Sequence, residues 1–344
     1  METHGVKYIG SKRSLIPYIL ECVKDLPVGT MLDPFTGTTR VAQAFRKKGW
    51  KVCASDLSWA SEAYAWLFLK TTSEDLEELQ ALVNSLGQLE GSSDWITQNY
   101  CDVVTPTGGV VRVWKPKNGM RADAIRNKIE EWDISYPMKM RLIAILILGM
   151  DAVDNTVGVQ QAYLKDWAAR TENNLRLTIP NGITEGPVGD FLLGSSLTLE
   201  YPEADIAYVD TPYSSHCYAT YYHIWDSITK WDKPEVGLNT NRRKDRIATS
   251  FDESMKSPWN SKKTAYAAFE CLFDRLPVKF ILVSYSDESL LSLSDLEPLL
   301  RKYKNYEVTE IDYKRNIMSK IGNATLYDKD RKQSNVEYII RIEK

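Results

Sequence analysis

The chain has few of the residues that build metal sites and disulfide frameworks. Its 344 residues include five cysteines and three histidines. The cysteines, at positions 22, 53, 101, 217 and 271, show neither zinc-ligand spacing nor a disulfide pattern, and the histidines form no ligand cluster. Scattered, odd-numbered cysteines suit a reducing cytosol, so we expect a cytoplasmic protein without a metal.

Long apolar runs and a strong excess of one charge are also absent. The most apolar run, residues 142–148, is far shorter than the roughly 20 residues that cross a bilayer, and no signal-type segment begins the chain. The net charge of −3 excludes a protein that coats nucleic acid indiscriminately, so phosphate binding would need local basic patches. The length favours one large domain with an insertion.

A glycine-rich phosphate fingerprint is missing from the first βα unit. An apolar strand leads into residues 33–37 (Asp-Pro-Phe-Thr-Gly), and a helical pattern follows. Gly37 lets the backbone approach a ligand, but Asp33 would repel a pyrophosphate. The next strand ends in Asp56, which can bind ribose hydroxyls or cap the helix from Ser58 onward. The two strand ends favour an adenosyl ligand.

The most informative stretch is the apolar run 206–209 with the four residues after it, Asp210, Thr211, Pro212 and Tyr213. The run reads as a buried parallel strand, and ligands of open α/β sheets bind beyond such strand ends. A carboxylate and a backbone carbonyl can accept the two hydrogens of an exocyclic amine while the ring stacks on the base. An ordinary turn is the alternative.

Basic residues gather in two places. Between Arg112 and Lys128 there are six basic residues and one acid, next to a hairpin predicted over 105–114 and among helices predicted over 74–86, 140–150 and 161–167. Such a patch fits groove and phosphate contact, although a solvated helix face has the same composition. Residues 239–263 read as a mobile loop that touches phosphates. Further strands are predicted over 279–285, 306–313 and 336–342.

In this order the segments resemble the D12 class of N6-adenine DNA methyltransferases, the Dam-like group that includes modification methylases of type II restriction systems. Residues 7–12 (Lys-Tyr-Ile-Gly-Ser-Lys) resemble its N-terminal motif, and 33–37 its S-adenosylmethionine loop. Residues 190–191 resemble the segment that contacts the cofactor's adenine, and 210–213 the Asp-Pro-Pro-Tyr catalytic motif. Thr211 replaces the first proline of that motif, and Thr39 replaces the second loop glycine.

The resemblance implies an α/β fold with a Rossmann-like S-adenosylmethionine-dependent methyltransferase sheet. The catalytic domain would comprise residues 1–70 and 176–344, and a mostly helical target-recognition insertion residues 71–175. The implied catalytic residues are Asp210, Thr211, Pro212 and Tyr213. The implied cofactor contacts are Tyr8, Lys12, Asp33, Pro34, Phe35, Thr36, Gly37, Asp56, Asp190, Phe191 and Asp210. The expected DNA contacts are Arg112, Lys115, Lys117, Arg121, Arg242, Arg243 and Lys244.

The expected reaction is methyl transfer from S-adenosylmethionine to N6 of an adenine flipped out of double-stranded DNA. N4-cytosine methylation, an RNA or protein substrate, and a catalytically silent DNA-binding relative remain alternatives. Cytosine-C5 chemistry is excluded, because no cysteine follows a proline. Further expectations are a bacterial or phage source, a cognate restriction endonuclease acting on the same site, and a monomer or weak dimer.

Overall fold

The computed structural model describes residues 2–8, 10–160, 162–212, 218–237, 242–246, 257–314 and 334–344. Three sequence predictions fall outside this part of the chain. They are the stacking ring of Tyr213, most of the basic loop 239–263, and the polar stretch that separates the last two strands.

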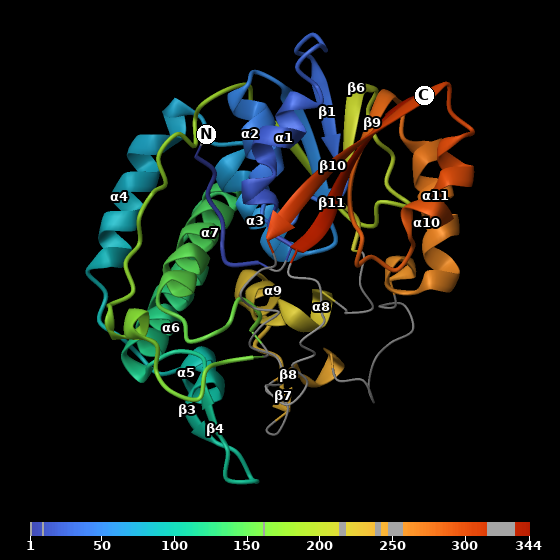
Figure 1. Cartoon of the computed structure of the whole chain (residues 1–344). Coiled ribbons are helices and arrows are strands. Elements are labelled where there is room, and N and C mark those ends of the chain that lie inside the picture. Colours follow the sequence, from blue (N-terminus) through green and yellow to red (C-terminus); the bar gives the residue numbers. More distant parts are fainter. Residues whose placement is uncertain are drawn as a thin grey trace.

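A seven-stranded sheet forms the centre of the molecule (Figure 1). Its order is β10-β11-β9-β6-β1-β2-β5. The strands are β1 (Thr30–Asp33), β2 (Lys51–Asp56), β5 (Asp190–Leu193), β6 (Ala204–Val209), β9 (Val278–Ser286), β10 (Asn305–Lys314) and β11 (Ser334–Glu343). The strands from β9 to β5 are parallel, whereas β11 runs antiparallel to both β9 and β10. The expected Rossmann-like α/β fold is confirmed.

Helices cover both faces of this sheet, because the central parallel strands are apolar on both sides. One face packs under α1 (Ile16–Glu21) and α2 (Arg40–Lys47), with Met31, Ile206 and Leu282 in the shared core. The other face packs under α10 (Lys262–Arg275) and α11 (Leu293–Leu300). The helix α3 (Trp59–Phe68) follows β2, and the short turn η1 (Lys12–Ser14) precedes α1.

The insertion is mostly helical and carries one hairpin. Its elements are α4 (Leu76–Gly87), α5 (Trp95–Tyr100), β3 (Cys101–Val104), β4 (Val110–Arg112), α6 (Pro116–Glu131) and α7 (Tyr136–Ala152). The remaining elements are η2 (Ser73–Asp75), η3 (Ala169–Glu172), α8 (Tyr218–Tyr221), α9 (His223–Lys230), β7 (Val236–Gly237), β8 (Arg242–Arg243), η4 (Lys244–Arg246) and η7 (Pro258–Asn260). The helix predicted over 161–167 is wrong, because residues 162–167 are not helical and Tyr163 instead bridges to Thr156.

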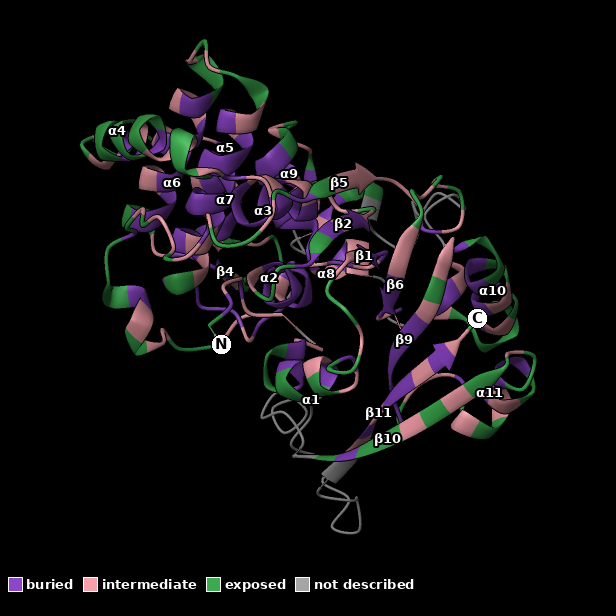
Figure 2. Ribbon diagram, turned by 90° about the horizontal axis from the view of Figure 1, so that it is seen from above, coloured by how far each residue is buried: buried purple, intermediate pink, exposed green. Residues whose placement is uncertain are grey.

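The insertion packs on the catalytic part through one continuous core. The residues of α7 are buried on nearly all sides, and they share an apolar cluster with Tyr64 and Leu67 of α3 and with Ile224 of α9 (Figure 2). A helix that is apolar all round belongs inside a protein. The placement of the insertion is therefore set by burial against α3 and α9. Within the described residues, no helix has both the length and the apolar character to cross a membrane.

Candidate active site

Three acids meet at the carboxyl edge of the parallel strands. Asp33 ends β1, Asp56 ends β2, and Asp210 follows the last residue of β6. β1 lies between the other two strands, so the three strand ends are neighbours. Parallel strands finish on the same side of a sheet, so this topology brings the three acids to the edge where ligands of such folds bind.

Asp56 joins the second strand to the glycine loop. One of its carboxylate oxygens accepts a hydrogen bond from the Gly37 amide at 2.8 Å, and the other accepts one from the Ser58 amide at 2.9 Å. Burial raises the pKa of Asp56, and the bonds from Ser58 and Gly37 oppose that rise. Asp56 therefore orders the glycine loop and also binds the residue that precedes α3. Ribose binding and helix capping, the two roles predicted for Asp56, are compatible.

Asp33 is almost fully enclosed. It is 1% exposed, and its Oδ1 has no hydrogen-bond partner among the described residues. Burial raises the pKa of Asp33 to about 8, and the charges of Asp210 and Asp56 add to that rise. The group is thus mostly protonated at neutral pH and leaves a buried oxygen for a ligand. A buried polar atom of this kind costs free energy unless a partner occupies it.

Lys12 forms an ion pair with Asp210. Its Nζ lies 2.9 Å from Asp210 Oδ1 and also donates to the Gly10 carbonyl at 3.1 Å. The lysine is only 5% exposed, so it is not a solvated surface residue. Burial raises the pKa of Asp210 and the charge of Lys12 opposes that rise. The pair therefore favours an ionised Asp210 inside a poorly solvated site.

Tyr8 covers the glycine loop. A side chain at Gly37, whose φ is +50°, would lie 3.8 Å from the Tyr8 ring. That ring stacks on Tyr222 at a centroid distance of 4.4 Å and lies 5.6 Å from the ring of Tyr218. The sequence showed that 218–231 is rich in aromatic residues but did not assign Tyr218 or Tyr222 to the site. Their contact with Tyr8 depends on the fold.

Thr39 occupies a backbone conformation that suits glycine. It precedes α2 with φ at 61°, in the left-handed region, where a residue with a Cβ costs roughly 1–2 kcal/mol. Its hydroxyl accepts a hydrogen bond from Gln43 Nε2 at 3.0 Å, and the side chain is fully buried. The hydroxyl thus partly offsets the strain where the family has glycine.

We predict that Thr39→Gly and Thr39→Ala differ in stability. Glycine relieves the backbone strain and loses one hydrogen bond, so its free energy of unfolding should stay within about 1 kcal/mol of wild type. Alanine keeps the strain and loses the bond, and should be less stable by about 1–2 kcal/mol. Urea denaturation measures both. An alanine variant more stable than the glycine variant would contradict this account.

Not every expected cofactor residue reaches the edge. Asp190 pairs in register with Cys53, three residues before the end of β2, and its exposed carboxylate lies 3.3 Å from Lys70 Nζ. Asp190 and Phe191 therefore lie back from the ends of β1 and β2, and their contact with the cofactor's adenine stays a prediction. In the loop after β1, Pro34 and Thr36 are buried, and Phe35 packs edge-to-face on Trp259, which gives this ring a structural role.

The basic residues expected to bind DNA divide into two groups. Arg121 donates to the carbonyls of Gly87, Leu89 and Leu175, and Arg243 is buried in ion pairs with Asp232 and Asp245. Both guanidinium groups hold parts of the fold together, which leaves them fewer donors to offer to DNA. The others are Arg112, Lys115, Lys117, Arg242 and Lys244; of these Lys115 and Lys244 pair with glutamates, and Lys117 donates to the Glu172 carbonyl.

We predict opposite effects for two arginines of the insertion. Arg121→Met should lower the free energy of unfolding by about 2 kcal/mol or more, because three carbonyls lose a charged donor. Arg112→Met removes only one exposed bond to the Lys165 carbonyl and an exposed ion pair with Asp102, so it should lower stability much less but cost about 1–3 kcal/mol against the cognate DNA site. Thermal melting and DNA titrations compare them. Equal stability of the two variants would count against the structural role of Arg121.

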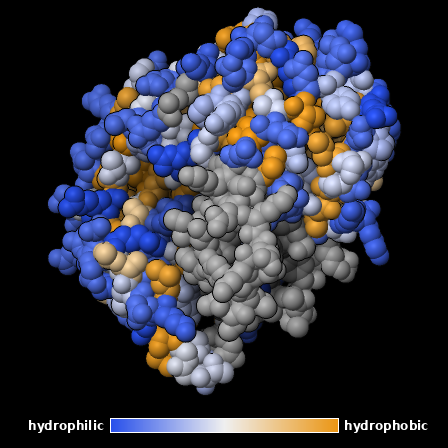
Figure 3. Space-filling model, viewed as in Figure 1, coloured by the Kyte–Doolittle hydropathy of each residue, from blue (hydrophilic) through white to orange (hydrophobic). Residues whose placement is uncertain are grey.

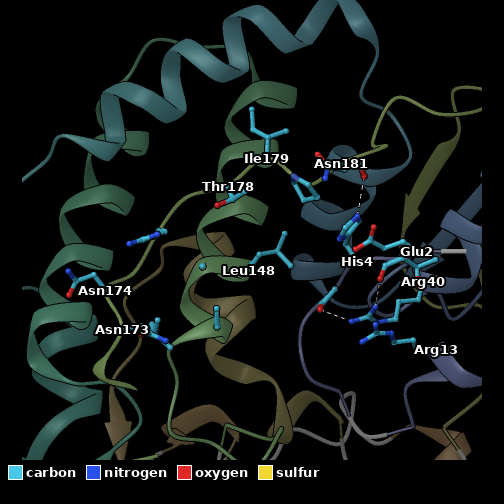
Figure 4. A pocket seen from close by; sticks show the side chains of 17 residues that line it. Glu2, His4, Arg13, Arg40, Leu148, Asn173, Asn174, Thr178, Ile179 and Asn181 are labelled. Atoms are coloured by element: carbon cyan, nitrogen blue, oxygen red, sulfur yellow. Dashed lines mark hydrogen bonds between the residues drawn. The ribbon is translucent and has the colours of Figure 1, made fainter. Parts of the chain in front are cut away.

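The cavity in Figure 4 is separate from the edge of the sheet where the three acids meet. It has a volume of about 780 Å³ and lies between the N-terminal residues, the end of α7 and residues 173–181. Arg40 donates to the carbonyls of Thr3 and Gly5 at 2.7 Å on one of its walls. None of the strand-end acids lines it. In the described part of the chain, no group of three or more histidines, cysteines and acids is arranged to hold a metal.

Comparison with known proteins assigns the class. The model of the D12 class N6 adenine-specific DNA methyltransferase family matches residues 8–317, and the chain belongs to this family. The family's reaction is transfer of a methyl group from S-adenosylmethionine to N6 of adenine in DNA. Membership of this family agrees with the expected adenine-specific DNA methyltransferase, and N4-cytosine methylation is not favoured.

Type II methyltransferase M.NlaIII of Neisseria lactamica is 26% identical, over 98% of this chain and 99% of that protein. Type II methyltransferase M.CviAII of Paramecium bursaria Chlorella virus 1 is 27% identical, over 92% and 95%. Modification methylase StsI of Streptococcus sanguinis is 28% identical over 89% of this chain but 48% of that protein. The chain thus spans about half the length of StsI, as of M.FokI and LlaI.

Proposed function

We propose that the carboxyl edge around Asp33, Asp56 and Asp210 is the active site of a site-specific DNA methyltransferase that modifies N6 of adenine in double-stranded DNA. The observation that carries this proposal is the ion pair of Lys12 and Asp210 beside the glycine loop. It brings the N-terminal motif, the loop and the catalytic motif, which are far apart in the sequence, to one place.

The residues present fit S-adenosylmethionine. Asp33 offers a buried oxygen without a partner among the described residues, Gly37 leaves open backbone beneath Tyr8, and Asp56 stands at the ribose position of such folds. When bound, the cofactor supplies a methyl group on a sulfonium, which needs little activation. We propose that Tyr8, Lys12, Asp33, Asp56 and Asp210 hold it, with Gly37 allowing its close approach.

The protein's part in the reaction is to position the amine. The exocyclic nitrogen of adenine is a poor nucleophile, because its lone pair is delocalised into the ring. The carboxylate of Asp210 and the carbonyl of Thr211 accept its two hydrogens, which draws the nitrogen toward tetrahedral geometry and frees the lone pair. Pro212 keeps the loop in place, and Tyr213 is proposed to stack on the base. Correct positioning supplies most of the rate in such a transfer.

DNA contact is proposed for the insertion and for the basic residues after β7. The target base must leave the duplex, at a cost of a few kcal/mol. The hairpin β3–β4 projects from the insertion away from the central sheet (Figure 1) and carries Arg112. The described surface seen in Figure 3 is mostly hydrophilic, as a face against DNA requires. The boundary of the target-recognition insertion at 71–175 remains a proposal.

Two relatives of nearly equal length are named type II methyltransferases. We therefore propose that a restriction endonuclease recognises the same DNA site. The function is tested by incubating the purified protein with DNA and S-adenosylmethionine and digesting the DNA to nucleosides for mass spectrometry. N6-methyladenine is expected. N4-methylcytosine, or no modified base on DNA that contains all short sites, would overturn the proposal.

A further inference from the structure

Glu337 on β11 is an acid enclosed by an apolar strand. It is 8% exposed and lies within β11, where Ile339, Ile340 and Ile342 are also buried. Its Oε2 has no hydrogen-bond partner among the described residues. A buried carboxylate oxygen without a partner is strongly unfavourable, so an adjacent ligand or charge would explain it.

The strand registers place Glu337 on the same face as the active-site acids. Side chains two residues apart in a strand share a face. Tyr208, Met31, Ala54 and Ile339 all belong to the cluster under α1 and α2. Each of these four residues has an acid two positions further along its strand toward the carboxyl edge. The four acids, in the same order, are Asp210, Asp33, Asp56 and Glu337, and they therefore lie on that face.

The position along the strands agrees with this. Glu337 pairs with Ser286, the last residue of β9, and Val283 of β9 pairs with Val209, the residue before Asp210. Glu337 thus lies at the carboxyl edge, although β11 itself runs the other way. Glu337 is separated from β6 by the single strand β9.

The charges around Glu337 are those of the active site. Burial raises the pKa of Glu337 to about 7, the charge of Lys12 opposes the rise, and Asp210 and Asp287 add to it. Lys12 therefore stabilises both Asp210 and Glu337 as anions. With Glu337 ionised, Lys12 faces two carboxylates rather than one, beside Asp56 and the mostly neutral Asp33.

We propose that Glu337 supplies the negative charge by which the cofactor site selects the sulfonium of S-adenosylmethionine over the neutral thioether of the product, S-adenosylhomocysteine. This inference rests on the proposed placement of the cofactor. The two molecules differ by one positive charge and one methyl group. A charge in poorly solvated protein acts over several ångströms without contact, so Glu337 need not touch the sulfur. Selectivity of this kind promotes exchange of product for fresh cofactor.

The selectivity depends on pH in a defined direction. The cation favours the ionised carboxylate, so binding of S-adenosylmethionine releases the proton held by Glu337. Its affinity should therefore rise as the pH passes about 7 and then level off, whereas affinity for S-adenosylhomocysteine lacks this component. Asp33 has a pKa of about 8, so its ionisation adds a second rise in affinity at higher pH, and a Glu337 variant retains that second rise.

The test measures both affinities by calorimetry for the wild type and for Glu337→Gln between pH 6 and 8. The variant should bind S-adenosylmethionine about tenfold more weakly at pH 8, the scale of one partly screened charge. Binding of S-adenosylhomocysteine should stay within about twofold, because the thioether carries no charge to interact with. The step near pH 7 should vanish. Calorimetry in two buffers of different ionisation enthalpy should also show fewer protons released.

Two variants serve as controls. Glu337→Asp keeps the charge and should keep the selectivity. Glu343→Gln removes an acid at the other end of the same strand, far from the carboxyl edge. There Glu343 pairs with Lys304 at 2.9 Å, so this variant should change neither affinity. If Glu337→Gln weakens both ligands equally or leaves their ratio unchanged, the proposal is wrong. If Asp56→Ala leaves cofactor affinity unchanged as well, the cofactor placement has failed, and with it the basis of this inference.

Discussion

Replacing Asp210 by asparagine should reduce methyl transfer by about a thousandfold or more. The carboxylate accepts a hydrogen of the target amine, and the charge of its partner Lys12 opposes the rise in its pKa that burial causes. Asparagine has nearly the same shape, but its amide is a weaker acceptor and can present a donor to the amine. Loss of a preorganised group that stabilises the transition state typically costs a hundredfold to a thousandfold, and the same group also faces the cofactor.

The fold must be checked separately, because Asp210→Asn removes the ion pair with the buried Lys12. Breaking such a pair costs about 3–5 kcal/mol. The double variant Lys12→Met, Asp210→Asn removes both charges and should melt at a higher temperature than the single variant, while remaining inactive. Asp205→Asn, at the other end of β6, is the matched control and should retain activity. Methyl incorporation near the wild-type rate in Asp210→Asn would exclude this residue as the catalytic acceptor.

Asp56→Ala should weaken binding of S-adenosylmethionine by about 1–3 kcal/mol, roughly ten- to a hundredfold. The carboxylate holds the Gly37 amide at 2.8 Å and is proposed to bind the ribose, so alanine loosens the loop and removes a ligand contact. Calorimetric titration of the cofactor measures the loss. Asp56 also accepts from the Ser58 amide, so the variant should lose some stability as well.

A matched variant separates cofactor binding from helix capping. Asp226 of α9 accepts hydrogen bonds from the Ser58 hydroxyl and the Ala60 amide, at the same end of α3. Asp226→Ala should therefore destabilise this helix end by about 1 kcal/mol and leave the Gly37 contact intact. Its cofactor affinity should change far less than that of Asp56→Ala. Equal losses in the two variants would reduce Asp56 to a helix cap.

The predicted strands were confirmed both for apolar runs buried on two faces, such as β6, and for the alternating edge strand β10. β1, β2, β6, β9, β10 and β11 all fall on predicted stretches. β5 was not predicted, because it has four residues, lies at the edge of the sheet and is only partly buried. The false helix at 161–167 has apolar residues at helical spacing, but residues 162–167 form an irregular segment that is only partly buried. Periodicity alone does not distinguish these cases.

The sequence by itself determined that acids end the strands around a glycine turn, since strand ends and turns are local patterns. It also identified the family, through segments that carry the chemistry. Only the tertiary structure decided which basic side chains hold the fold together: Arg121 and Arg243 have the same composition signal as Arg112, yet Arg121 donates to three carbonyls and Arg243 pairs with two acids.

The same holds for Glu337, which is far from the catalytic motif along the chain. Its position beside Asp210 follows from the pairing of β11 with β9 and of β9 with β6. A shift of one residue in that register would turn its side chain to the opposite face. Contacts between distant segments depend on register and burial, which arise when the whole chain packs, and no local pattern contains them.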